Sequence, residues 1–173
     1  MTDSIRYLTP RADGKDDAWA EEAAARGQRG TQQLREVSEV APPAHIAEAL
    51  RLSAGETCIV RRRLVLADAR PVELADSYYP LSIARASPLA EARKVKGGAV
   101  AALAALGHAP VRAKEDVSAR RPTAEEARLL DLTESDWVLV LCRTSRDADG
   151  VEVEASVMIM VAEGRHLRYE LTV

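Results

Sequence analysis

Short stretches of apolar or alternating residues recur along the chain, and this two-residue period is typical of β-strands. Two of them, "CIVRRRLVLA" at 58–67 and "PVELADSYY" at 71–79, are joined by a short "DAR" turn and predict a hairpin. A second hairpin is predicted from 137–145 and 151–161, around an "ADG" turn. We expect further strands at 31–41, 110–121 and 166–173.

Helices are predicted between these strands, over 16–27, 42–52, 97–107 and 122–132. Asp17 is expected to cap the first helix, and prolines begin the second. Thr123 and Glu126 have capping-box spacing at the start of the fourth. The segment 97–107 is almost entirely apolar, so we expect that helix to be buried.

The segment that begins at Ala49 is echoed 80 residues later by the segment that begins at Leu129. Arg63 matches Arg143 in this alignment, and each copy consists of a helix, a tight loop, a strand, a turn and a returning strand. Two such units with further strands predict one pseudo-symmetric α+β domain, an antiparallel β-sheet with packed helices.

Composition narrows the class of protein. A chain of 173 residues fits one domain with a core of its own. Its formal net charge is −3, without the basic excess of a protein that holds DNA by itself. No run approaches the roughly 18 apolar residues of a membrane span, and the polar N-terminus lacks a secretory signal. We expect a cytoplasmic protein that does not contact a membrane.

Cysteine and histidine give no sign of a cofactor. Cys58 and Cys142 lie in apolar, strand-like runs, where reduced cysteines act as small core residues. The three histidines are far apart, and none has a second ligand at metal-site spacing. We therefore predict neither a metal nor another cofactor.

The three consecutive arginines at 61–63 do not form one patch, because neighbouring side chains of a strand point to opposite faces. Arg63 and Val65 share a face, and Ser77 and Tyr79 share a parity on the returning strand. Such a set is suited to hydrogen-bonding a small ligand. The alternative is a solvated strand face with scattered charges, and contact with DNA is less favoured than either because no basic helix accompanies the run.

The order of these pieces resembles a known family. The resemblance is carried by "APPAHIAEALRLSAGETCIVRRRLVLADARPVELADSYYP", "GGAVAALAALG", "TAEEARLLDL" and "VLVLCRTSRDADGVEVEASVMIM". Together they are similar to the UTRA domain, the effector-sensing domain of GntR-type transcription regulators of the HutC subfamily. The likeness covers the chain from about residue 7 to 173, so we expect a tail at 1–6 and a UTRA-like domain at 7–173.

The resemblance implies a chorismate-lyase-like fold, with a small-molecule effector bound between sheet and helices and a homodimer formed through the sheet region. In the family a winged helix-turn-helix precedes this domain, and only a handful of residues do so here. We therefore expect DNA to be reached only through a separate winged helix-turn-helix. The implied function is a regulatory sensor and not an enzyme.

Only some of the ligand-binding residues of the family are present in this sequence. Sugar-phosphate-sensing members use two arginines on the strand that resembles 58–67; Arg63 matches one of them, and Val65 replaces the other. Hydroxyls of the family are replaced at Asp17–Ala18 and at Ala99, and an acidic residue is replaced by Ala75. Glu154 fits the family's acidic position.

Backbone N–H groups after Gly97 and Gly98 are still expected to face an anion. Because each lost charge-assisted hydrogen bond costs on the order of 1.5–3 kcal/mol, we predict that the effector is not a sugar phosphate. We expect a less anionic, more apolar molecule that contacts Val65, Met158 and Met160, although both methionines are equally consistent with plain core packing.

Two other functions remain open. A lyase acting on a chorismate-like acid would need cations for two carboxylates, for which Arg63 and Arg143 are candidates, but no persuasive acid–base pair accompanies them. A protein-interaction module that pairs with a full-length regulator is the second alternative.

Overall fold

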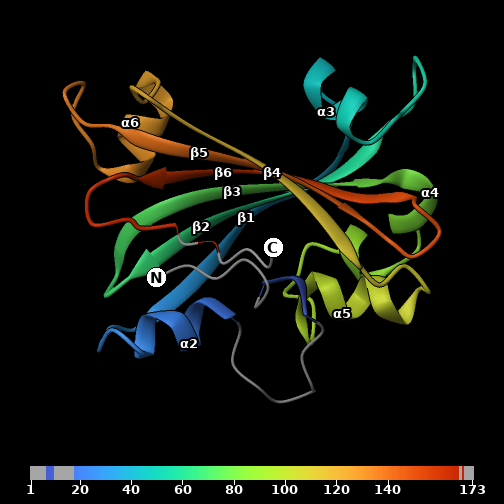
Figure 1. The fold of residues 1–173 in the computed structure, drawn as a ribbon, viewed down its shortest axis with the longest axis horizontal. Coiled ribbons are helices and arrows are strands. Elements are labelled where there is room, and N and C mark those ends of the chain that lie inside the picture. The colour runs from blue at the N-terminus through green and yellow to red at the C-terminus, as the bar shows by residue number, and fades with distance from the viewer. Residues whose placement is uncertain (1–6, 10–17, 168, 170–173) are drawn as a thin grey trace.

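The computed structural model describes residues 7–9, 18–167 and 169, which form a six-stranded antiparallel sheet with short helices on both faces (Figure 1). The strands are β1 (Gly30–Val40), β2 (Cys58–Ala67), β3 (Arg70–Pro80), β4 (Arg112–Arg120), β5 (Val138–Arg146) and β6 (Glu152–Val161). The α-helices are α2 (Ala18–Ala24), α3 (Ala44–Ala49), α4 (Leu81–Ala84), α5 (Gly98–Ala105) and α6 (Ala124–Leu130), and a 3₁₀-helix η1 spans Pro88–Ala90. The predicted α+β class is confirmed.

The 80-residue echo is a true repeat of the fold. The strand order is β1-β2-β3-β6-β5-β4, so a three-stranded meander with α3 and a second with α6 meet at β3 and β6. The repeat extends further than the sequence indicated, because β1 and β4 also correspond. At the junction, Ser77 of β3 lies opposite Ser156 of β6.

Each face of the sheet is covered by its own set of helices. One face carries α2, α4 and α5, and the other carries α3 and α6 (Figure 1). Trp19 of α2 packs against Val65 and Ala75, and its Nε1 donates to the carbonyl oxygen of Leu66 at 2.8 Å. A Cβ at Gly30 would lie 2.8 Å from that of Ala23, so the close contact of α2 with β1 requires a glycine there.

Arg61 fixes the loop that leads into α5. Its side chain is buried, and its Nη atoms donate to the carbonyl oxygens of Leu89, Glu91 and Arg93 at 2.9, 2.8 and 2.7 Å. These carbonyls belong to η1 and the irregular segment after it, which has no strand to pair with. One guanidinium therefore provides hydrogen bonds to three backbone carbonyls of this irregular connection.

Some predicted elements need correction. The helix predicted at 97–107 is only partly buried: Ala102 and Leu103 are buried, but Leu106 is 41% exposed, because this surface helix covers one edge of the core. Helices α4 and η1 were not predicted. Asp17 and most of the strand predicted at 166–173 lie outside the described residues.

Among the described residues, no helix is long and apolar enough to cross a membrane.

The capping box of α6 is confirmed and gives a stability prediction. Thr123 Oγ1 accepts from the Glu126 amide at 3.2 Å, and Glu126 Oε2 accepts from the Thr123 amide at 2.8 Å. We expect Thr123→Ala to lower the free energy of unfolding by about 1 kcal/mol, measured by urea denaturation. The control Glu125→Gln, in the same helix turn but outside the box, should change it by no more than a few tenths of a kcal/mol. Equal effects of the two substitutions would contradict this role of Thr123.

Arg61 gives a larger predicted effect. Arg61→Met should lower the free energy of unfolding by at least about 3 kcal/mol, because three carbonyls lose charge-assisted hydrogen bonds. The matched control is Arg62→Met: Arg62 points to the other face, where its ion pairs with Glu36 and Asp76 are partly exposed and contribute about 0–1 kcal/mol. If Arg62→Met costs as much stability as Arg61→Met, the loop is not held in this way.

Candidate functional site

The predicted alternation of the arginine run is confirmed. Arg61 and Arg63 lie on the face covered by α2 and α5, whereas Arg62 lies on the opposite face, with its ion pairs to Glu36 and Asp76 at 3.3 and 3.4 Å. The three charges are thus divided between two surfaces, and Arg61 is occupied by backbone carbonyls. Of the three, Arg63 is therefore the arginine available to a ligand-binding site.

A continuous chain of hydrogen bonds joins Arg63 to Tyr79 across the junction of β3 and β6. Arg63 Nη2 donates to Ser77 Oγ at 3.1 Å, and the hydroxyls of Ser77 and Ser156 lie 3.1 Å apart. Ser156 Oγ and Tyr79 Oη each donate to Glu154 Oε1 at 2.9 Å. We call these five residues the Arg63–Tyr79 chain.

The chain has a fixed direction. Ser156 has one hydroxyl proton and gives it to Glu154, so Ser77 must donate to Ser156 while it accepts from Arg63. Arg63, Ser77 and Ser156 therefore donate in sequence toward the Glu154 carboxylate, and Tyr79 donates to it from the other side. Because Ser77 and Ser156 are buried, these bonds replace contacts with water and polarise one another.

The two charged members of the chain, Arg63 and Glu154, have no ion-pair partner among the described residues. Arg63 Nη1 donates to Gln32 Oε1 at 3.1 Å, its Nε is buried without a hydrogen-bond partner, and no carboxylate in the described part of the chain lies within ion-pair distance. No described cation pairs with Glu154 either. Burial and the nearby charge of Glu154 raise the pKa of Tyr79, which keeps its hydroxyl a donor.

Charges around the chain are already matched. Arg143 lies opposite Ser156, and its Nε donates to Glu115 Oε1 at 2.6 Å with both side chains largely buried. Glu73 Oε2 lies 3.6 Å from Arg165 Nη2, and burial raises the pKa of Glu73 in spite of that cation. The unpaired guanidinium of Arg63 thus stands out in this region.

The remaining predicted residues lie around the chain. Val65 packs beneath Trp19 of α2, and Met160 is buried further along β6, opposite Glu73. Gly97, Gly98 and Ala99 form the start of α5, where Ala99 packs against the apolar cluster that contains Tyr79. The structure thus brings Arg63, Ser77, Tyr79 and Glu154 into direct contact and places Val65, Arg143, Met160 and the start of α5 around them.

The sequence interpretation missed Ser156, Gln32 and Glu115. Ser156 follows Glu154 by two residues and so shares its strand face, a signal that the sequence did contain. Gln32 and Glu115 come from β1 and β4, whose pairing with β2 and β5 no local pattern announces.

This arrangement presents hydrogen-bonding and charged groups, with no metal cluster or activated thiol in the described part of the chain. In the described residues, no group of three or more His, Cys, Asp or Glu side chains is placed to hold a metal ion. Both cysteines are free thiols, and burial raises the pKa of each, as expected for core residues and not for nucleophiles. The Arg63–Tyr79 chain offers a cation, hydroxyls and a carboxylate on a single sheet face.

Comparison with known proteins agrees with this fold. The model of the UTRA domain matches residues 25–164. An uncharacterised HTH-type transcriptional regulator of Streptomyces coelicolor is 33% identical over 138 residues, which are 78% of this chain and 51% of that protein. The chain thus spans about half the length of this curated relative.

Solved structures extend the likeness. The effector domain of PhnF from Mycobacterium smegmatis has a TM-score of 0.77 at 22% identity, with 90% of this chain and 95% of that one covered. The ligand-binding domain of a GntR-family regulator from Bordetella bronchiseptica has a TM-score of 0.73 at 24% identity, covering 93% and 95%. For the C-terminal domain of the histidine utilization repressor from Pseudomonas syringae the TM-score is 0.71 at 19% identity, covering 84% and 100%.

These structures establish the fold, and the family model, which matches well over half of the sequence, establishes the membership. The chain belongs to the UTRA domain family of GntR-type transcription regulators.

Proposed function

We propose that this domain binds a small organic effector at the Arg63–Tyr79 chain, between the sheet and helices α2 and α5. The observation that carries the proposal is the pair of unmatched charges, Arg63 and Glu154, linked through buried hydroxyls. The side chain of Arg63 is half-buried, and its buried Nε has no hydrogen-bond partner, so a ligand that supplies an oxyanion would form a charge-assisted hydrogen bond there. The similar structures of an effector domain from Mycobacterium smegmatis and a ligand-binding domain from Bordetella bronchiseptica support the same inference.

The chemistry of the site defines the class of effector. Arg63 calls for one oxyanion, and Glu154 calls for a hydrogen-bond donor. Val65 and Met160 on the same sheet face offer apolar contact for the body of the molecule. A small monocarboxylic acid with a hydroxyl or amino group fits this set better than a sugar phosphate, whose dianion would meet a single free arginine.

The regulatory consequence follows from where the helices lie. A ligand held between the sheet and helices α2 and α5 stabilises whichever arrangement of those helices it contacts best, and so shifts the equilibrium between conformations. We propose that a homodimer passes this change to a separate winged helix-turn-helix that contacts DNA. Such a regulator works in the cytoplasm, where its DNA is.

Catalysis is not part of this proposal. A lyase acting on a dicarboxylic acid would need two free cations, and Arg143 is already neutralised by Glu115 at 2.6 Å. Glu154 Oε1 already accepts hydrogen bonds from Tyr79 and Ser156, both at 2.9 Å, so this oxygen is engaged within the protein. The geometry therefore favours a sensor over an enzyme.

Thermal denaturation in the presence of small hydroxy- and amino-monocarboxylic acids tests the proposal. We expect at least one such acid to raise the Tm, and Arg63→Met to weaken its binding by about 10- to 100-fold, the equivalent of a charge-assisted hydrogen bond of 1.5–3 kcal/mol. Arg62→Met, which removes the same charge from the opposite face, should bind the acid as the unaltered protein does. Unchanged affinity in Arg63→Met would contradict the proposed site.

A further inference from the structure

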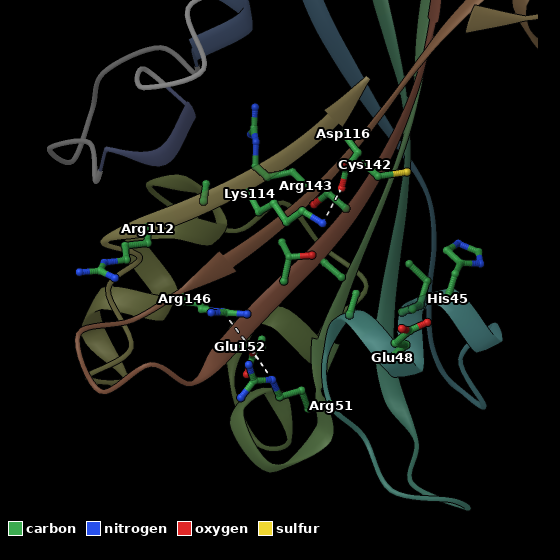
Figure 2. Close-up of a pocket in the computed structure, with 16 residues that line it drawn as sticks. His45, Glu48, Arg51, Arg112, Lys114, Asp116, Cys142, Arg143, Arg146 and Glu152 are labelled. Carbon is green, nitrogen blue, oxygen red and sulfur yellow. Dashed lines mark ion pairs between the residues drawn. The ribbon is translucent and has the colours of Figure 1, made fainter. Parts of the chain in front are cut away.

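A groove lies on the other side of the sheet, between α3 and the strands β4, β5 and β6 (Figure 2). It encloses about 670 Å³, a volume suited to a small molecule. Its walls carry charged side chains, among them Arg51 after α3, Lys114 and Asp116 from β4, Arg146 from β5 and Glu152 from β6. Ser156, a member of the Arg63–Tyr79 chain, also borders the groove, but the hydrogen bonds of that chain lie on the face covered by α2 and α5.

One buried carboxylate organises this groove. Glu152 is 5% exposed, and its Oε1 lies 2.9 Å from Nε of Arg51 and 2.9 Å from Nε of Arg146 (Figure 2). Neither contact has the geometry of a hydrogen bond, so Oε1 is a buried oxygen without a hydrogen-bond partner. A single carboxylate thus holds two guanidinium groups side by side without saturating either.

A β-bulge and a left-handed residue place these side chains. The register of β5 and β6 shifts between Ser145 and Arg146, which turns Glu152 toward the α3 face although Glu154 faces α5. Arg51 has φ of 52°, just after α3, and Asp131 has φ of 55° at the matching position after α6. The backbone turn is therefore common to both repeats, but only the first repeat puts a cation there.

The mouth of the groove has excess positive charge. Arg51 and Arg146 share one counter-ion, and their side chains are 66% and 44% exposed. In the described part of the chain, no residue accepts a hydrogen bond from either guanidinium. Arg112 lies opposite Arg146 on β4 and has no ion pair among the described residues, whereas Lys114 is matched by Asp116 at 3.2 Å.

We propose that this groove is a second binding site, for a small oxyanion held by the Nη groups of Arg51 and Arg146. Planar guanidinium forks match the two oxygens of a phosphate or carboxylate, and a pair fixed in advance by Glu152 loses little side-chain freedom on binding. Arg112 adds attraction at the rim. The site differs from the proposed effector site in its cations, because Arg51 and Arg146 meet at Glu152 on the α3 face and Arg63 lies on the opposite face.

The experiment is a titration of the full chain with sodium phosphate and, separately, with sodium acetate, followed by two-dimensional ¹H–¹⁵N NMR. Sodium chloride of equal ionic strength serves as the reference. We expect saturable shifts in the NMR signals of residues 51, 146 and 152 with one or both anions. Tighter binding of phosphate than of acetate would indicate a phosphoryl ligand, and the reverse would indicate a carboxylate ligand.

Variants make the assignment specific. Arg146→Gln and Arg51→Gln, both at exposed side chains, should each weaken binding by at least about fivefold, whereas Arg128→Gln on the exposed surface of α6 should leave it unchanged. Shifts that grow linearly as they do with chloride, or equal affinity in all three variants, would overturn the proposal. Shifts confined to Arg63 and its neighbours would also overturn it, and would point to the effector site instead.

Discussion

The antiparallel pairing of β3 with β6 is the constraint on which the structure depends. It joins the two repeats into one sheet and sets Ser77 opposite Ser156 at their junction. Hydroxyls buried there must find partners within the protein, since an unpaired polar group in the interior costs about 1–3 kcal/mol. Arg63 and Glu154, one from each repeat, supply those partners, so the pairing that closes the fold also creates a polar line through its centre.

Strand geometry then assigns different tasks to neighbouring residues. Of three consecutive arginines, Arg61 holds a loop, Arg62 forms surface ion pairs and Arg63 remains available to a ligand. The bulge in β6 likewise places two carboxylates on different faces of the sheet, with Glu152 on the α3 face and Glu154 on the α5 face. Contacts on the two faces of the sheet are thus linked through one strand, β6.

The sequence predicts much of this because its signals are local. The bounds of β2, the face shared by Arg63, Ser77 and Tyr79, and the capping box of α6 follow from alternation and spacing that neighbouring residues control. What it does not predict depends on distant partners. Nothing in the irregular segment before α5 shows that Arg61 will bind its carbonyls, no pattern announces the bulge at Glu152, and the Glu115–Arg143 pair requires knowing the register of β4.

We propose that the UTRA sheet binds its effector along the Arg63–Tyr79 chain. The most direct test is a crystal structure of the protein purified from the organism that makes it, so that a tightly held effector is retained. We expect a small molecule between α2 and α5, with an oxyanion against Arg63 and a hydrogen-bond donor against Glu154. A ligand bound elsewhere, with Arg63 still bonded only to Gln32 and Ser77, would contradict it.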